Sequence, residues 1–387
     1  MLSKPDIADE GAKYFLSHFD RPATALSWAP GRINIIGEHT DYNDGLALPA
    51  AVNRYVAMAV ASRGDGKIHF QSHNYQEHFE IELATLHDLK PTKHWHRYMV
   101  GALRVFQDLG HPLSGMDVLL IGDIPAGSGL SSSAALVLAW LGALAEHHKV
   151  QLDPWTMVKS SQRVEHEYLG VLCGLLDQIG SQMSVANQVL AVDFQSLTVS
   201  PTSYNLPGYC WVAIHTGKSR ELAESAYQTR VHECREALDR LKSEHPHIQT
   251  MRDVGAELVQ GSDNLSKRIR HVVQENRRVE QAMTCIQNDA EGLGKLLDES
   301  HRSLRDDYEV SCDELNAMVE IATSQDGCIG ARMMGGGFGG STLNLVETAK
   351  AKKFIDETLT QYGTRYPLLK PSALIAKLVT GAASLTL

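Results

Sequence analysis

Alternating apolar and polar positions, and apolar residues at helical spacing, divide the N-terminal half of the chain into strands and helices. Strands are predicted at residues 26–28, 52–62, 67–73, 78–83 and 118–121, and helices at residues 7–19 and 95–109. The turn Gly64-Asp65-Gly66 separates two of these strands, so we expect residues 52–62 and 67–73 to pair as a hairpin. The pattern predicts a mixture of helix and sheet.

The C-terminal half shows the same mixture beyond a segment rich in Pro, Ser, Asn and Gly. That segment, SPTSYNLPG at residues 200–208, is typical of a domain boundary. Strands are predicted at residues 189–198, 210–214, 341–346 and 372–380, and helices at residues 153–169, 221–241, 264–286, 290–302 and 349–362. We therefore predict an α+β protein with two domains, residues 1–204 and 205–387.

Residues 118–140 carry a strand, a loop rich in glycine and serine, and a helix in succession. An apolar run leads into Pro125, Gly127 and Gly129, and three serines precede an alanine-rich helix. Glycines let main-chain N–H groups approach phosphate oxygens, and the first N–H groups of a helix are unpaired. A flexible Gly/Ser connector is the alternative. Because two strongly apolar segments flank the loop, we favour a phosphate site, although the lysine of a Walker A loop is missing.

A second polar segment, APGRINIIGEHTDYNDGLALP, occupies residues 29–49. Its side chains with hydrogen-bonding groups are Arg32, Glu38, His39, Asp41 and Asn43, and its glycines and prolines favour irregular backbone. Carboxylates accept from sugar hydroxyls, while neutral His and Asn donate or accept. A polar turn with local caps explains one such residue better than five together. The segment therefore predicts a sugar site.

An acidic residue within an apolar run is a third candidate for a functional site. Asp177 lies in LCGLLDQIG at residues 172–180, where a buried carboxylate is costly without partners. This setting favours either a functional carboxylate or a helix cap over a surface charge. A glycine-rich segment, ARMMGGGFGGST at residues 331–342, formally contains G-x-G-x-x-G, but a strand pattern follows it where a dinucleotide fold needs a helix.

Bulk properties exclude several classes of function. A formal net charge of −10 argues against nucleic acid as a partner, and no apolar stretch approaches the roughly 20 residues that span a bilayer. The N-terminus has no apolar signal-peptide region, and six scattered cysteines without a C-x-x-C pair read as reduced thiols. We therefore expect a cytoplasmic protein, without a zinc site of recognisable spacing.

Three motifs together resemble one family. The order Pro-x-Gly-x-Gly-Leu-Ser-Ser-Ser-Ala is similar to the second motif of the GHMP kinases, and residues 333–340 are similar to the third. GRINIIGEHTDYNDG followed by Leu48-Pro49 resembles the signature of the galactokinase branch. The resemblance implies a two-domain GHMP fold, with an N-terminal domain like ribosomal protein S5, a ferredoxin-like C-terminal domain and the active site between them. It also implies phosphorylation of galactose at its C1 hydroxyl by ATP with Mg²⁺.

The resemblance assigns roles residue by residue. Asp177 is implied as the catalytic acid/base, with Arg32 beside the transferring phosphoryl group. The sugar contacts that it implies are Glu38, His39, Thr40, Asp41, Gly174 and Tyr227. The ATP contacts that it implies are Pro125, Gly127, Ser128, Gly129, Leu130, Ser131, Ser132 and Ser133, together with Trp95. Ser133 and Glu165 are implied as the ligands of Mg²⁺.

Several alternatives stay open at this point. Trp95 begins an amphipathic helix, where a tryptophan is more often core than a stacking platform. Glu165 would otherwise pass for a solvated carboxylate on a helix. The whole chain could be a kinase for N-acetylgalactosamine or arabinose, or a regulator that binds sugar and ATP without chemistry. The intact serine loop, with Arg32 and Asp177 present, favours a catalytic galactose kinase over a regulator. We expect it to act as a monomer.

Overall fold

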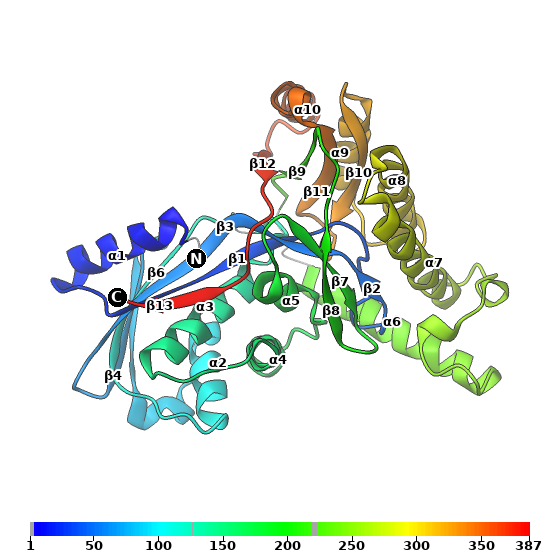
Figure 1. Cartoon of the computed structure of the whole chain (residues 1–387). Helices are drawn as coiled ribbons and strands as arrows, with labels where there is room; N and C mark the ends of the chain where they lie inside the picture. Colours follow the sequence, from blue (N-terminus) through cyan, green and yellow to red (C-terminus); the bar gives the residue numbers. More distant parts are fainter. Residues whose placement is uncertain (1–3, 126, 219–222) are drawn as a thin grey trace.

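The computed structural model describes residues 4–125, 127–218 and 223–387. A six-stranded sheet, a four-stranded sheet and a small three-stranded sheet carry helices on their faces (Figure 1). The predicted α+β class is confirmed.

The largest sheet has the strand order β13–β1–β3–β6–β4–β5. Its strands are β1 (Ala25–Asn34), β3 (Pro49–Ser62), β4 (Lys67–Ser72), β5 (Glu77–Glu82), β6 (Met116–Gly122) and β13 (Ala383–Thr386). Helix α1 (Asp6–Phe19) packs on one face, and helices α2 (His94–Asp108) and α3 (Ser132–His147) pack on the other.

The predicted hairpin between residues 52–62 and 67–73 is wrong. Strand β6 lies between β3 and β4, pairing antiparallel with β3 and parallel with β4, and the hairpin partner of β4 is β5. The reason is burial. Val56 and Met58 of β3 face the core under α2 and α3, while Ala57 and Ala59 face α1. A strand that is apolar on both faces belongs in the middle of a sheet, next to the equally apolar β6.

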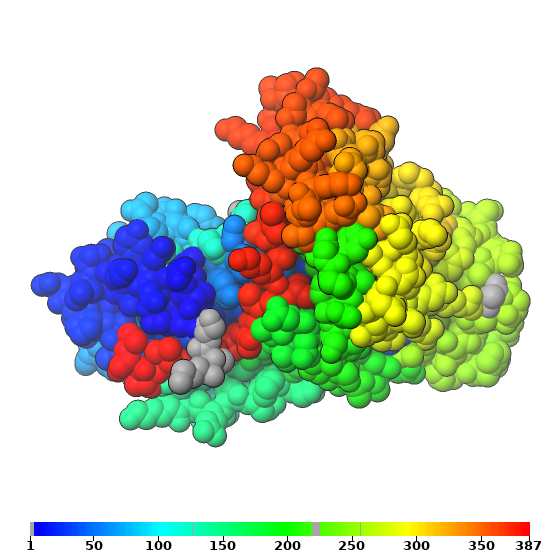
Figure 2. All heavy atoms as spheres, turned by 45° about the horizontal axis from the view of Figure 1, so that its top comes forward, coloured from blue at the N-terminus to red at the C-terminus, as the bar shows by residue number. Residues whose placement is uncertain are grey.

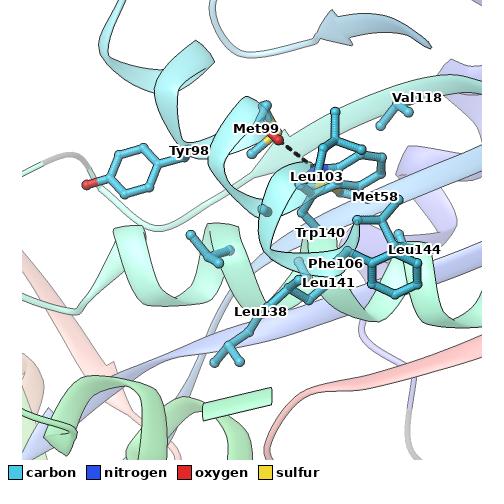
Figure 3. Close-up of a cluster of buried hydrophobic side chains, with 14 of the residues drawn as sticks. Met58, Tyr98, Met99, Leu103, Phe106, Val118, Leu138, Trp140, Leu141 and Leu144 are labelled. Carbon is cyan, nitrogen blue, oxygen red and sulfur yellow. Dashed lines mark hydrogen bonds between the residues drawn. The ribbon is translucent and has the colours of Figure 1, made fainter. Parts of the chain in front are cut away.

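Trp140 of α3 lies at the centre of the core beneath α2 (Figure 3). Its indole N–H donates to the carbonyl oxygen of Met99 at 3.2 Å, so the one polar atom of this buried ring is satisfied. Leu103 and Phe106 of α2 belong to the same cluster, as does Tyr98, whose ring points away from Trp140 (Figure 3). The core therefore fixes α3, and with it the loop that precedes α3.

The helix predicted over residues 153–169 is not regular throughout. Asp153 caps α4 (Pro154–Val164) by accepting from the main-chain N–H groups of Trp155 and Thr156. The chain then widens into a π-turn at Glu165–Leu169. Such turns are often found at functional sites. Helix α5 (Leu176–Met183) follows, and the small sheet joins β2 (Leu46–Ala47), β7 (Gln188–Asp193) and β8 (Thr198–Ser203).

The remaining elements form the second large unit, on the right and top of Figure 1. Its sheet has the order β10–β11–β9–β12, with strands β9 (Tyr209–His215), β10 (Cys328–Met334), β11 (Ser341–Glu347) and β12 (Ser372–Ala376). Its helices are α6 (Ala223–Glu244), α7 (Asn264–Cys285), α8 (Ala290–Asp306), α9 (Asp313–Ser324) and α10 (Ala351–Arg365). The predicted helix over 221–241 begins in residues outside the described ones, and its described part belongs to α6.

The end of the chain returns to the first sheet. Beyond β12, the red segment of Figures 1 and 2 runs back to the N-terminal elements. There β13 pairs with β1, with Thr386 opposite Ala25. The final residues thus complete the N-terminal sheet, and the proposed division after residue 204 stays a prediction. Within the described ranges, no helix combines the length and apolarity that crossing a bilayer requires.

Candidate active site

A cavity of about 290 Å³ lies where the end of β1, the start of α3, the π-turn, α5 and the loop after β10 meet. It brings together residues from all three sequence motifs. The predicted residues that line it are Arg32, Glu38, His39, Asp41, Gly127, Gly129, Ser131, Ser132, Ser133, Glu165, Gly174, Asp177 and Tyr227.

Arg32 lies on β1, contrary to the irregular backbone expected for its segment. Its Nε donates to Oδ1 of Asp177 at 2.9 Å, and Nη2 donates to the same oxygen. Nη1 donates to the carbonyl oxygen of Gly129. Asp177 stands in the first turn of α5, but its side chain makes no capping hydrogen bond. The helix-cap alternative is therefore wrong, and the carboxylate faces the cavity with a guanidinium partner.

The phosphate loop is anchored, which contradicts a flexible connector. The main-chain N–H of Arg32 donates to the carbonyl oxygen of Leu130 at 2.9 Å, and the Ser341 hydroxyl donates to the carbonyl oxygen of Ser128. Gly127 and Gly129 take φ values of 68° and 75°, in the region that favours glycine. Pro125 accepts from the N–H of Ser128 at 3.2 Å and does not line the cavity.

The loop also offers unused hydrogen-bonding groups at the start of α3. The hydroxyls of Ser128 and Ser131 are buried and have no partner among the described residues. Ser131 precedes the helix without capping it, so the first N–H groups of α3 are not used by its side chain. Buried polar groups and a helix N-terminus suit a multiply charged anion.

The sugar segment places its side chains by main-chain contacts. Thr40 is buried and donates to the carbonyls of Gly37 and Leu46, so it holds the turn and does not line the cavity. His39 adopts a left-handed backbone with φ of 62°, and Asn43 donates to its carbonyl at 2.8 Å. These contacts fix the direction in which His39 and its neighbours point.

Asp41 faces both the sugar segment and α5. Its Oδ2 accepts from the N–H of Leu176 at 3.4 Å. Burial, and then the nearby charge of Asp177, raise the pKa of Asp41 to about 7. A side chain at Gly174 would place its Cβ 2.0 Å from Oδ2 of Asp41, so only glycine fits there. Asp41 and Asp177 thus share one polar corner of the cavity.

Tyr227 closes the cavity from the C-terminal unit. Its ring centroid lies 5.5 Å from the ring of His39 and 5.5 Å from that of Tyr42. Burial, followed by the charge of Asp41, raises the pKa of the Tyr227 hydroxyl well above its ordinary value. The hydroxyl is therefore a neutral donor or acceptor for a ligand.

Glu165 lies on the π-turn and is buried, which contradicts the alternative of a solvated carboxylate. Its Oε2 accepts from the Cys173 thiol at 3.3 Å, and its Oε1 has no hydrogen-bond partner by geometry within the described chain. Burial, and then the charge of Asp177, raise the pKa of Glu165 to about 7, while the neighbouring Ser133 hydroxyl acts in the opposite direction.

A buried carboxylate oxygen beside a serine hydroxyl and a phosphate loop fits a hard divalent cation such as Mg²⁺. Among the described residues, no preformed group of three or more His, Cys, Asp or Glu side chains could hold a metal on its own.

Trp95 does not line the cavity. Its indole N–H donates to Glu77 at 3.1 Å, and its ring packs edge-on against Phe79 at 4.9 Å. This packing favours the core interpretation over a stacking platform for adenine.

Sequence reasoning missed a buried ion pair that joins the first and third motifs. Arg332 of β10 is fully buried, and its Nη2 donates to Oε1 of Glu38 at 3.1 Å. The main-chain N–H of Gly335 donates to the same oxygen at 2.8 Å. Arg332 also donates to the carbonyls of Asn34 and Ile35. An arginine three positions before the first glycine of a glycine-rich loop was the one available signal. The cavity is lined in addition by Tyr98, Val171, Cys173, Leu176, Gly335, Gly336 and Gly337.

Family models match most of this architecture. The model described as GHMP kinases N terminal domain matches residues 97–184, and that described as GHMP kinases C terminal matches residues 281–363. The mevalonate kinase of Methanococcus jannaschii shares the fold, with a TM-score of 0.70 over 93% of this chain and 100% of its own, at 16% identity. The fold and the phosphate loop thus define a kinase of the GHMP class.

The first motif narrows the class. A model described as the galactokinase galactose-binding signature matches residues 13–62. The galactokinase of Thermotoga neapolitana is 37% identical over 88% of this chain and 94% of its own length, and that of Bacillus subtilis is 36% identical over 88% of each. The crystal structure of Lactococcus lactis galactokinase complexed with galactose matches with a TM-score of 0.92, 31% identity and coverage of 98% of this chain and 100% of its own. The chain belongs to the galactokinase family.

Proposed function

We propose that this protein transfers the γ-phosphoryl group of ATP to the C1 hydroxyl of α-D-galactose, giving α-D-galactose 1-phosphate and ADP. The observation that carries the proposal is the contact of Arg32 with both Asp177 and the Gly129 carbonyl. It puts a carboxylate and a guanidinium between the phosphate loop and the sugar segment, where an attacking hydroxyl would meet a phosphoryl group.

The sugar would lie against Glu38, His39, Asp41, Gly174 and Tyr227. These residues line one part of the cavity. They offer carboxylate acceptors, an imidazole and a phenol, which together can pair several hydroxyls in a fixed arrangement. A sugar with one inverted hydroxyl would leave buried polar groups unpaired, so we expect discrimination between epimers.

The nucleotide phosphates would lie against Gly127, Gly129 and Ser131 to Ser133. The unpartnered hydroxyls of Ser128 and Ser131 support an anion at this place. Mg²⁺ would be held by Ser133 and Glu165, and when bound it would neutralise charge on the phosphates. The unpartnered Oε1 of Glu165 supports this assignment.

Asp177 would orient the C1 hydroxyl and accept its proton, and Arg32 would neutralise charge on the transferring group. Phosphoryl transfer needs little covalent help from the protein, so positioning and charge are expected to dominate the rate enhancement. We further propose that the protein is cytoplasmic, in keeping with six cysteines that form no disulfide. We also propose that it acts as a monomer.

A coupled assay for ADP with a panel of monosaccharides tests the proposal. Galactose, glucose, N-acetylgalactosamine and arabinose would be compared, and the product identified by ³¹P NMR. We expect kcat/KM for galactose to exceed that for glucose by at least about 100-fold. Equal values for the two epimers, or ADP release without a sugar 1-phosphate, would overturn it. A higher kcat/KM for N-acetylgalactosamine or arabinose would reassign the substrate.

A further inference from the structure

Helix α7 of the C-terminal unit holds the main chain of the sugar segment at two places. The main-chain N–H of Gly37 donates to Oε1 of Glu275 at 3.0 Å, and that of Leu46 donates to Oδ1 of Asn276 at 2.8 Å. The two acceptors are buried and are neighbours on α7. One turn of this helix therefore binds the start and the end of residues 37–46, which we call the sugar loop.

The two ends of the sugar loop also lie against each other. Gly37 has a φ of 99°, and a Cβ atom there would lie 2.4 Å from the carbonyl oxygen of Leu46. A Cβ atom at Gly45 would lie 2.5 Å from Oδ1 of Asn276 and 2.7 Å from Cβ of Thr40. A side chain at either glycine would have to displace these atoms. The base of the sugar loop is thus closed tightly against α7.

A third contact from α7 reaches the sugar loop between its ends. Nε2 of His271 lies 3.1 Å from the carbonyl oxygen of Glu38, and Nδ1 lies 2.9 Å from the Ser303 hydroxyl. Because a carbonyl oxygen can only accept, Nε2 carries a hydrogen and donates it. His271 is fully buried and lies about one helical turn before Glu275. Its donor fixes the main chain at Glu38, a residue that lines the cavity.

Glu275 is an ionised carboxylate inside the protein. Its Oε1 also accepts from the Ser300 hydroxyl at 2.7 Å, and its Oε2 accepts from Nε of Arg278 at 2.7 Å. Burial acts to raise the pKa of Glu275, but the charge of Arg278, with those of other nearby groups, outweighs burial and lowers this pKa to about 2. A buried ion pair stabilises a fold little compared with apolar residues of similar volume. Stability alone therefore gives a weak reason for a carboxylate at this position, whereas its contact with Gly37 reaches the sugar loop.

We propose that His271, Glu275 and Asn276 are positioning residues for the sugar site. They do not line the cavity. They fix the main chain of the sugar loop, and thereby the side chains that this loop turns toward the sugar. The phosphate loop is anchored by other contacts, so the effect should fall on the sugar and not on the nucleotide. The consequence for galactose rests on the proposed function, whereas the fixed main chain is a property of the free protein.

Two double variants separate the contact with Gly37 from the ion pair. Glu275→Gln with Arg278→Leu removes both charges but keeps an oxygen that can accept from Gly37, and Glu275→Leu with Arg278→Leu removes that oxygen as well. We expect the second variant to have a KM for galactose about tenfold above that of the first, with KM for Mg·ATP within about twofold. Arg277→Leu, at an exposed position of the same helix, is the control and should change neither constant.

The positioning is tested without any sugar by hydrogen exchange of the free protein, read by mass spectrometry of peptides that cover residues 37–46. We expect exchange at least about tenfold faster in Glu275→Leu with Arg278→Leu than in Glu275→Gln with Arg278→Leu. If the first of these variants does not fold, His271→Leu and His271→Gln allow the same comparison, because a glutamine amide can replace Nε2–H as the donor to Glu38.

Equal exchange in the two variants of a pair would overturn the positioning, and equal KM for galactose would overturn its consequence for the sugar. An equal rise of KM for galactose and for Mg·ATP would also contradict the proposal, because it would indicate a general loosening of the site. If the protein phosphorylated no galactose, the proposed function would fail, and the exchange rates would still decide whether α7 positions the sugar loop.

Discussion

Arg32 contacts Asp177 from 145 positions away in the sequence, with 2.9 Å between Nε and Oδ1. The guanidinium is almost fully buried, while the carboxylate is about one-third exposed toward the cavity, at 5% and 34% of their side-chain surfaces. The same arginine reaches the carbonyl of Gly129. The buried guanidinium of Arg32 therefore contacts both the proposed base, Asp177, and the phosphate loop. Asp177 is thus part of the site and not an isolated charge in an apolar segment.

Ser133 is expected to act on the metal and nucleotide without supporting the fold. Ser133→Ala removes one hydroxyl from the start of α3, beside Glu165. We expect KM for Mg·ATP and the Mg²⁺ concentration for half-maximal rate to rise about tenfold, with little change in Tm. Ser196→Ala, in the exposed turn between β7 and β8, is the control. Wild-type values of KM, kcat and Mg²⁺ dependence would reassign Ser133 as an ordinary first residue of the helix.

Arg332 should matter for stability far more than a surface arginine. Arg332→Met would leave the Glu38 carboxylate without its cation and deprive Asn34 and Ile35 carbonyls of a donor. Loss of one partner from a buried pair costs about 3–5 kcal/mol, to be measured by urea unfolding. Arg305→Met, which breaks an exposed pair with Asp306, should cost less than about 1 kcal/mol. An equal loss of unfolding free energy in Arg332→Met and Arg305→Met would show that the buried ion pair stabilises the fold no more than the exposed one.

Because the pKa of Glu165 is raised, we expect Glu165→Gln to change the stability of the folded protein by an amount that depends on pH. The folded protein binds this proton up to about pH 7, whereas the unfolded chain releases it near its ordinary value. The folded state therefore loses stability as pH rises from about 4.5 to 7 through this group. In metal-free protein we expect Glu165→Gln to raise the free energy of unfolding at pH 8 by about 3 kcal/mol and to change it little at pH 4.5.

The control for this experiment is Glu167→Gln, an exposed carboxylate on the same π-turn that pairs with Arg163. It should show no gain at pH 8. Thermal or urea unfolding at the two pH values measures both variants. If Glu165→Gln raised the free energy of unfolding by the same amount at pH 4.5 and pH 8, the folded protein would not disfavour the charged form of the Glu165 carboxylate.

The local motifs could be predicted from the sequence because each carries its own chemistry. A glycine loop between an apolar strand and an apolar helix has few other uses, and the polar cluster around Glu38 is dense enough to recognise. The contacts between motifs could not be predicted. Arg332 meets Glu38, and Tyr308 meets Tyr42, only because β10 and α8 pack against the sugar segment from hundreds of positions away.

The same limit explains the wrong hairpin. Strand pattern and a Gly-Asp-Gly turn are local, and both favour pairing of residues 52–62 with residues 67–73. In the structure, β3 pairs with β6 instead of β4. This pairing is favoured because both strands are buried on both faces, and that burial depends on the complete sheet. Glu165 was ambiguous for a related reason. Its helix pattern reads as exposed, and only the π-turn and the cavity reveal that its carboxylate is buried.

The central claim is that Asp177 acts in catalysis from its contact with Arg32. Asp177→Asn keeps an oxygen that can accept from Arg32 but removes the charge and the proton acceptor. The direct measurement is kcat for galactose phosphorylation, with Tm and galactose affinity determined on the same preparation. We predict a folded protein that still binds galactose and whose kcat falls about 10² to 10⁴-fold. A folded variant with near wild-type turnover would contradict the account.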